Sequence, residues 1–332
     1  MTEIQRYKEY VYEMSTESAV ACQNENEMDQ VCPNKPAVRR MGNPQRPALM
    51  PQESVLDLHN TYESYRTFND FHQHLERLLE QGELLEEVVH VSMTVGIIEP
   101  FTGKHIAPEN IDVSGTNYRE SLVGNDLLSR NRGILMVLEK LYGSLGELRN
   151  KDIYLLEALS GFAMWLKREI GNDRLICSEY QEFAENKLLD VPHQDLCALT
   201  FADASFDLVL CSEVYEHVQD LEKAFRETAR VLRPGGMLVA TCPLAFGQIE
   251  GIVKARHNPK SGNTEHFVEA EFHGDPVRPK TGSLVYRIPG WDVLDQLRQA
   301  GFTEAYLDHV VSWKHGVIGS DLPGVLVIKA MR

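Results

Sequence analysis

Residues from about 150 onward predict an α/β fold in which a mostly parallel sheet is covered by helices on both faces. Short, continuously apolar runs alternate there with stretches of helical periodicity. Such runs are typical of strands that are buried on both faces of a parallel sheet. Turn-forming sequences such as "RPGG" (233–236) separate the runs. The alternation therefore predicts strands joined by helical crossovers.

The segment before this sheet is expected to be a mainly helical extension or cap, residues 54–148. Residues 54–82 carry large apolar side chains at spacings of three and four, which predicts helix. The β-branched run "VVHVSMTVGII" (88–98) predicts extended structure. Residues 126–142 predict a second helix, which Gly143 ends.

Six segments are expected to form the strands of the sheet. They are "DIYLLEAL" (152–159), "RLICSEY" (174–180), "FDLVLCS" (206–212), "MLVATC" (237–242), the end of "GWDVLDQLRQAGFTEAYLDHV" (290–310) and "PGVLVIKAM" (323–331). A helix with Leu221, Phe225 and Leu232 on one face joins the third and fourth segments. Another helix, closed by Gly301, precedes the fifth segment.

The composition favours a small-molecule partner. The formal net charge of -16 argues against nucleic acid, because no basic stripe offsets the acidity. No run reaches the roughly 18 apolar residues of a membrane-spanning helix. Residues 1–53, rich in Asn, Gln, Pro and Met, predict a flexible arm that begins without a secretory signal. Cys177, Cys211 and Cys242 lie in strand-like runs and predict buried free thiols, so we expect a cytoplasmic protein.

The block "DLCALTFADASFDLVLCSEVYEHVQDLEKAFRETARVLRPGGMLVATCP" (195–243) resembles class I S-adenosylmethionine-dependent methyltransferases with a type 11-like domain. The resemblance extends over about 150–332. It implies a Rossmann-like sheet of seven strands with an antiparallel last strand, and it implies S-adenosylmethionine as the cofactor. It also implies that Asp195 lies near the adenine.

The expected binding site lies at the carboxyl ends of the strands, where open α/β sheets hold their ligands. Glu179 is expected to accept the ribose hydroxyls, because it follows the second strand at a distance from Glu157 that suits one βαβ unit. The alternative for Glu179 and Asp195 is a solvated carboxylate at a strand or loop end. The remaining cofactor-binding candidates at these ends are Ala158, Tyr180, Leu196, Ser212 and Glu213.

The loop after the first strand departs from the family pattern. The family usually shows Glu-x-Gly-x-Gly-x-Gly there, whereas Glu157 is followed by Ala158, Leu159 and Ser160, and only Gly161 remains. Side chains on this loop would crowd the usual cofactor path, because only glycine lets a ligand approach the backbone closely. Three alternatives remain: a displaced ligand, a wider loop or lost binding.

A polar insert, residues 244–290, follows the fourth strand and is expected to form a lid over the acceptor site. His266 and His273 are the first candidates for a catalytic base, and His217, in the Glu216–His217 pair, is the next candidate. The alternative is a lid whose polar groups bond to each other. No metal site is expected, because the ligand types lack a tight recurrent spacing.

Three functions fit these residues. The first is a small-molecule methyltransferase, and a homodimer is possible. The second is cyclisation of S-adenosylmethionine to azetidine-2-carboxylate and methylthioadenosine, with Tyr154 facing the sulfonium and with Asn117 and Ser178 holding the amino acid. Arg119 would clamp the methionine carboxylate, or else form an ordinary Arg–Glu pair. The third is a non-catalytic protein that keeps the fold.

Overall fold

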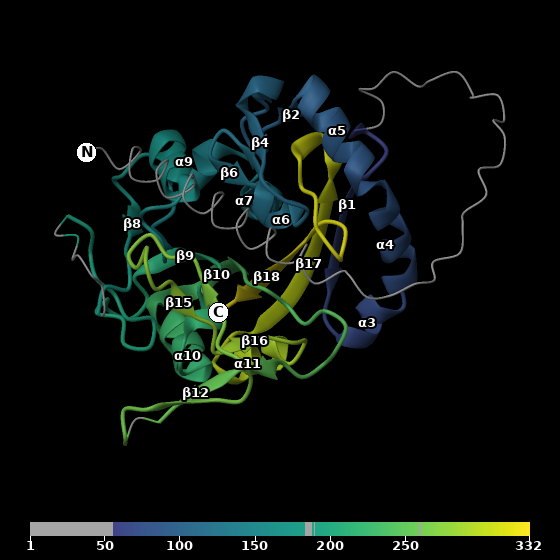
Figure 1. The fold of residues 1–332 in the computed structure, drawn as a ribbon. Coiled ribbons are helices and arrows are strands. Elements are labelled where there is room, and N and C mark those ends of the chain that lie inside the picture. Colours follow the sequence, from purple (N-terminus) through teal and green to yellow (C-terminus); the bar gives the residue numbers. More distant parts are fainter. Residues whose placement is uncertain (1–55, 183–187, 189, 259) are drawn as a thin grey trace, which may run out of the picture.

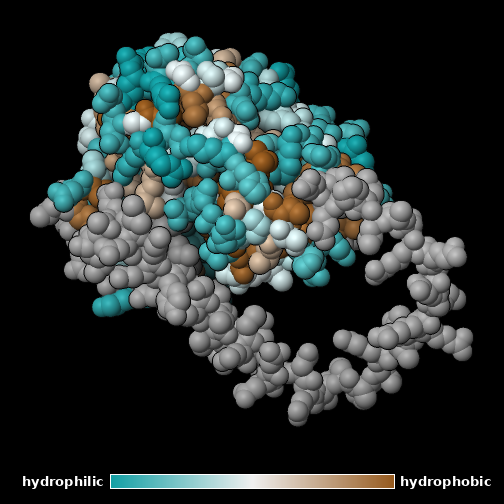
Figure 2. Space-filling view, turned by 90° about the horizontal axis from the view of Figure 1, so that it is seen from above, coloured by the Kyte–Doolittle hydropathy of each residue, from teal (hydrophilic) through white to brown (hydrophobic). Residues whose placement is uncertain are grey.

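The computed structural model describes residues 56–332, apart from 183–187, 189 and 259 (Figure 1). The predicted arm, residues 1–53, lies outside the described residues. None of the described helices is long and apolar enough to span a membrane. Figure 2 shows a mainly hydrophilic face on which hydrophobic side chains form small scattered groups.

A seven-stranded sheet organises the fold, as predicted. Its strands in spatial order are β1 (Asn60–Tyr65), β17 (Glu304–Ser312), β18 (Val325–Met331), β10 (Leu232–Thr241), β9 (Phe206–Ser212), β7 (Ile153–Leu155) and β8 (Leu175–Cys177). Strands β8, β7, β9 and β10 pair in parallel, whereas β18 is antiparallel to β10 and β17. The mostly parallel sheet and its antiparallel last strand are therefore confirmed.

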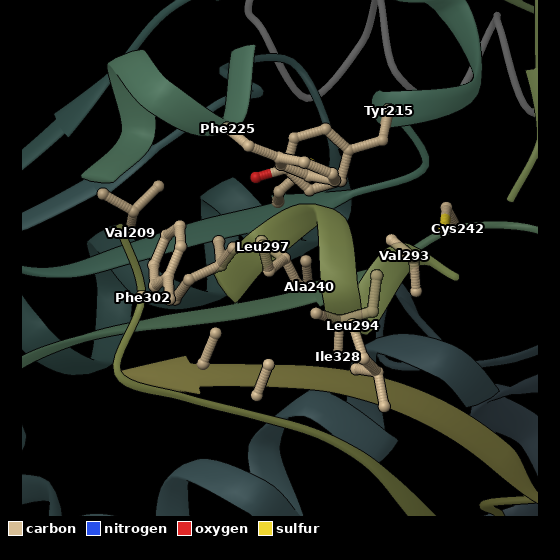
Figure 3. Close-up of a cluster of buried hydrophobic side chains, with 14 of the residues drawn as sticks. Val209, Tyr215, Phe225, Ala240, Cys242, Val293, Leu294, Leu297, Phe302 and Ile328 are labelled. Carbon is tan, nitrogen blue, oxygen red and sulfur yellow. The ribbon is translucent and has the colours of Figure 1, made fainter. Parts of the chain in front are cut away.

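Helices cover both faces of this sheet (Figure 1). On one face lie α7 (Ser129–Tyr142), α8 (Leu145–Arg149) and α9 (Gly161–Ile170), and on the other α10 (Leu221–Val231) and α11 (Val293–Gln299). Strand β9 serves both cores, because Leu208 packs with the first group and Val209 with the second. Successive side chains of a strand point to opposite faces. Figure 3 shows the second core, where Phe225 of α10 and Leu297 of α11 lie against the sheet.

The helical prediction for residues 54–82 is wrong at its start. Strand β1 pairs antiparallel with β17 and adds an edge to the sheet, which local apolar spacing does not reveal. The rest of the segment is helical, in α3 (Phe68–His72) and α4 (Leu75–Gln81). The chain then continues through the 3-10 helix η1 (Gly82–Leu84).

The extended prediction for residues 88–98 is also wrong over most of its length. Helix α5 (Leu85–Val95) occupies it, and only β2 (Ile97–Ile98) is extended. Val88 and Val91 lie on the buried side of α5, in a core that contains Trp313. This packing outweighs the strand preference of β-branched residues.

The predicted end of the next helix is confirmed, because α7 stops at Gly143, which has a φ of 72°. Short elements lie between α5 and α7: β3 (His105–Ile106), η2 (Pro108–Asn110), β4 (Ile111–Val113), α6 (Tyr118–Ser121), β5 (Leu122–Gly124) and β6 (Leu127–Leu128). The buried guanidinium of Arg132 donates to the carbonyl oxygens of Leu122, Leu127 and Gly316. These bonds tie the extension to the turn η4 (Trp313–His315) after β17.

The insert forms three short antiparallel pairs. They are β11 (Ile252–Val253) with β16 (Arg287–Ile288), β12 (Ala255–His257) with β13 (Thr264–His266), and β14 (Phe272–His273) with β15 (Ser283–Leu284). The insert is attached to the 3-10 helix η3 (Tyr215–His217), since the Tyr286 amide donates to the Glu216 carbonyl at 2.8 Å.

Candidate functional site

A cleft of about 1900 Å³ lies at the carboxyl ends of β7, β8, β9 and β10. Glu157, Glu179, Ser212 and Cys242 line it from the strand ends. Strands β14 and β15 of the insert line the opposite side. The cleft therefore occupies the edge at which parallel α/β sheets bind their ligands.

The Glu179 carboxylate holds the loop that lacks the family glycines. Its Oε1 accepts the backbone N–H groups of Ala158 at 2.8 Å and Leu159 at 3.1 Å. Burial raises the pKa of Glu179 to about 7. The Ala158 side chain packs in the core, whereas Leu159 lines the cleft. Of the three side chains predicted to crowd the cofactor path, Leu159 and Ser160 therefore line the cleft, and Ala158 does not.

The Glu157 carboxylate lies beside this loop and lacks a partner for one oxygen. Among the described residues, nothing hydrogen-bonds to its Oε1. Burial raises the pKa of Glu157 to about 8. Helix α9 starts next to it at Gly161, where a Cβ would come within 1.9 Å of the Asp126 carbonyl oxygen. Packing against Asp126 therefore requires glycine at this position, which also lines the cleft.

Arg119 forms an internal ion pair. Its guanidinium donates to both carboxylate oxygens of Glu213, at 2.5 and 3.0 Å, and to the Cys242 carbonyl oxygen at 3.2 Å. Arg119 also contacts Glu120, and Glu120 in turn contacts Arg130. Because all these groups line the cleft, they form a charged wall of two cations and two anions.

Glu213 is the centre of this wall. It has a φ of 56°, a left-handed backbone that costs a non-glycine residue energy and that recurs at functional sites. Burial opposes its ionisation, but Arg119 and Arg130 outweigh that effect and lower its pKa to about 2. Ser212, the preceding residue, accepts hydrogen bonds from Arg130 and Asn131, each at 3.2 Å. The Glu213 carboxylate is therefore ionised and fixed in position.

Tyr154 and Ser178 line the cleft, and both side chains are almost fully buried. The Tyr154 ring is 1% exposed and stacks on Phe206 with the ring centroids 5.4 Å apart. Its hydroxyl and the Ser178 Oγ are 2.8 Å apart. Asn117 is exposed at the start of α6, on the rim of the cleft.

The remaining binding candidates also line the cleft. The Asp195 Oδ1 accepts the Cys197 amide at 2.8 Å, which shapes the loop around Leu196. The Tyr180 ring lies 5.4 Å from the Arg278 guanidinium, which donates to the Tyr180 carbonyl oxygen at 2.9 Å. This contact closes the insert over the end of β8.

The structure brings two predicted histidines together and separates the third. His217 and His273 both line the cleft, and their ring centroids are 5.1 Å apart. His266 is exposed on β13 and is not part of the cleft lining. Between the two rings lies Glu216, whose Oε1 is 3.6 Å from the His217 Nε2 and 3.7 Å from the His273 Nδ1.

The charged residues of the site that were not predicted include Glu120, Arg130, Glu271 and Arg278. Glu120 directly follows Arg119 in "NYRE" (117–120), so its proximity to Arg119 was a usable signal. No local sequence signal indicated Arg130 or Glu271, because the tertiary fold brings each of them to its ion-pair partner.

Comparison with known proteins agrees with this geometry. Residues 168–240 match the family model of a methyltransferase domain. This segment is therefore similar to S-adenosylmethionine-dependent methyltransferases. The matched segment runs from the middle of α9 into β10.

Its similarity to curated methyltransferases is partial. An uncharacterized methyltransferase of Mycobacterium avium is 34% identical over 110 residues, which cover 33% of this chain and 42% of that protein. A probable S-adenosylmethionine-dependent methyltransferase of Mycolicibacterium smegmatis is 40% identical over 77 residues, covering 23% and 30%. The chain thus spans less than half the length of these relatives.

Among solved structures, an S-adenosylmethionine-dependent methyltransferase from Mesorhizobium loti is 17% identical, with a TM-score of 0.35. That match covers 55% of this chain and 91% of the other. The strand order and strand directions of this chain itself define its fold.

Proposed function

We propose that this chain is a methyltransferase that transfers the methyl group of S-adenosylmethionine to a small molecule. The observation that carries the proposal is the acidic cleft at the strand ends of a methyltransferase domain. Such a cleft, roofed by an insert, suits a ligand of nucleoside size and an acceptor above it. The net charge of -16 supports an acceptor other than nucleic acid.

The side chains at the base of the cleft fit the cofactor. The unpartnered Oε1 of Glu157 fits the ammonium group of the methionine part, because a buried carboxylate oxygen needs a donor. Glu179 uses Oε1 for the loop amides, which leaves Oε2 to accept a ribose hydroxyl. Asp195 also lines the cleft, and its proposed role is to accept a hydrogen bond from the adenine amine. Bound there, the cofactor supplies a methyl group on a positively charged sulfur.

The residues under the insert form the acceptor side. Methyl transfer needs the acceptor atom aligned about 3 Å from the methyl carbon, so positioning matters more than acid–base strength. Where the acceptor also loses a proton, His273 is the candidate to take it. Its neighbours Glu216 and Glu271 raise its pKa by stabilising the imidazolium. Arg119 is occupied by Glu213, so its proposed role is to hold the cleft wall rather than to clamp the ligand carboxylate.

Cyclisation of the cofactor is less well supported. It needs an arm bent by a crowded loop and an aromatic face at the sulfonium. However, Ala158 packs in the core, and Tyr154 is enclosed by Phe201 and Phe206. No feature of the family match favours that reaction.

Incubation with S-adenosylmethionine alone separates the two reactions. We expect calorimetry to show micromolar binding of S-adenosylhomocysteine. We also expect chromatography to show no methylthioadenosine without an acceptor and S-adenosylhomocysteine once an acceptor from a small-molecule panel is present. Methylthioadenosine from the cofactor alone would establish cyclisation or lyase chemistry instead. Absence of binding at millimolar ligand would contradict cofactor use altogether.

Cofactor affinity is expected to rise with pH. In the free protein Glu179 and Glu157 have pKa values of about 7 and about 8, above their ordinary 4.5. Binding to a ribose hydroxyl and an ammonium requires the ionised forms, so affinity should fall up to about tenfold per pH unit per group below those values. Calorimetry with S-adenosylhomocysteine from pH 6 to 9 measures this. Glu157→Gln should flatten the upper part of the curve, and a flat curve in the unmodified protein would contradict both assignments.

A further inference from the structure

The roof of the cleft contains a carboxylate whose surroundings are unusual. Glu216 is 0% exposed, and neither carboxylate oxygen has a hydrogen-bond partner among the described residues. Its nearest polar neighbours are His217 and His273, whose nitrogens lie 3.6 and 3.7 Å from Oε1. These distances are too long for hydrogen bonds. A buried carboxylate without hydrogen-bond donors is costly, so Glu216 favours a cationic partner at this position.

The two histidines are oriented with one nitrogen each toward this carboxylate. The His217 Nδ1 lies 2.9 Å from the carbonyl oxygen of Leu284. A carbonyl only accepts, so Nδ1 carries the proton and the neutral ring has its lone pair on Nε2. The His273 Nε2 lies 3.1 Å from the carboxylate Oε1 of Glu271, which places the lone pair of the neutral ring on Nδ1. Both lone pairs therefore face the same space as Glu216.

This arrangement matches the surroundings of metal-ligating histidines. Such histidines usually donate their second ring N–H to a carbonyl or carboxylate, which fixes the tautomer and the ring. Here Leu284 and Glu271 accept those two protons, and Lys254 in turn pairs with Glu271. Leu284 and Glu271 both belong to the insert, so the insert orients both histidine rings.

The spacing of the three ligand atoms also fits one ion. One nitrogen of each histidine and one oxygen of Glu216 all lie within 4.8 Å of one another. Two ligands about 2.1 Å from a tetrahedral zinc ion are roughly 3.4 Å apart. The observed 3.6 and 3.7 Å need only a small contraction. Both histidines also line the cleft, which leaves an open coordination position on that side.

We propose that Glu216, His217 and His273 bind one divalent transition-metal ion of the zinc type, with an open position toward the cleft. Two imidazoles and one carboxylate are a ligand set that zinc accepts at sites with an open position. An ion there would bind an oxygen-bearing acceptor and lower the pKa of its hydroxyl. With the ion bound the histidines would act as ligands, and His273 would act as the base only in the metal-free protein. Metal binding itself depends only on these side chains and does not require methyl transfer.

Direct titration with zinc tests the site. Protein first dialysed against a chelator is titrated with ZnCl₂ in a calorimeter, with metal analysis after gel filtration. We expect one zinc ion per chain, and a loss of affinity of at least about tenfold in His217→Ala and in His273→Ala. His266→Ala, with an exposed histidine of the same insert, is the matched control and should bind zinc as the unmodified protein does.

Two further measurements keep the outcome clear. Glu216→Gln keeps the shape of the side chain and removes its charge, so it should weaken zinc binding while thermal melting of the metal-free protein reports whether the fold is kept. Cobalt(II) in place of zinc should give visible absorption bands that disappear in the His217→Ala/His273→Ala variant. Zinc bound equally by that double variant, or no zinc bound by the unmodified protein, would overturn the proposal. Cofactor binding measured in parallel separates this result from the proposed methyl transfer.

Discussion

Replacement of Glu213 by alanine is expected to lower the free energy of unfolding by about 3–5 kcal/mol at neutral pH. The variant leaves Arg119 and Arg130 buried, with Glu120 as their remaining ion-pair partner among the described residues. The removal of one partner from a buried ion pair is costly because the remaining charge stays desolvated. Urea unfolding followed by circular dichroism measures the difference. Glu120→Ala is the matched control, with a smaller expected loss because its side chain is 34% exposed.

The pH dependence distinguishes charge from packing in this variant. The pKa of Glu213 is lowered from 4.5 to about 2, so its carboxylate stabilises the fold above pH 4.5. This contribution, about 3 kcal/mol for such a difference, is lost as the pH falls from 4.5 toward 2. The difference in the free energy of unfolding between the unmodified protein and Glu213→Ala should therefore become smaller between pH 4 and pH 3. If this difference does not change with pH, lost packing contacts rather than the lost charge destabilise the variant.

The sheet could be predicted because its strands carry their signal locally. Strands such as β9 are buried on both faces, so their sequences are continuously apolar, and glycines such as Gly143 mark where helices end. Strand β1 could not be recognised in the same way. Its position depends on pairing with β17, more than two hundred residues away. Five of its six residues are not buried, so burial imposes no alternating pattern on its sequence.

For the candidate site, the sequence predicted which residues line the cleft but not which groups they contact. Glu157, Glu179 and Asp195 follow strands, and the topology of a parallel sheet brings such ends to one cleft. The partners of these side chains were not predictable. Nothing local indicates that Glu179 turns toward the Ala158 amide, or that His273 approaches His217 across the insert. Such contacts are decided by tertiary packing.

Replacement of Glu179 by alanine should weaken S-adenosylhomocysteine binding by more than tenfold. Two effects contribute. The variant loses the proposed hydrogen bond to the ribose, and a charged hydrogen bond of about 2 kcal/mol corresponds to more than a factor of ten in affinity. It also frees the amides of Ala158 and Leu159, which the carboxylate now fixes at 2.8 and 3.1 Å. Calorimetric titration at pH 8, where most of the carboxylate is ionised, measures the combined loss.

Two variants separate these effects. Glu179→Gln keeps one acceptor oxygen for the loop amides but loses the charge, so its affinity should lie between those of the unmodified protein and Glu179→Ala. Glu182→Gln changes an exposed carboxylate that bonds to the Tyr180 hydroxyl outside the cleft lining, and it should bind as the unmodified protein does. Unchanged affinity in Glu179→Ala would remove this residue from the cofactor site. Equal losses of affinity in Glu179→Gln and Glu179→Ala would mean that the charge of Glu179, rather than its hydrogen bonds to the loop amides, governs binding.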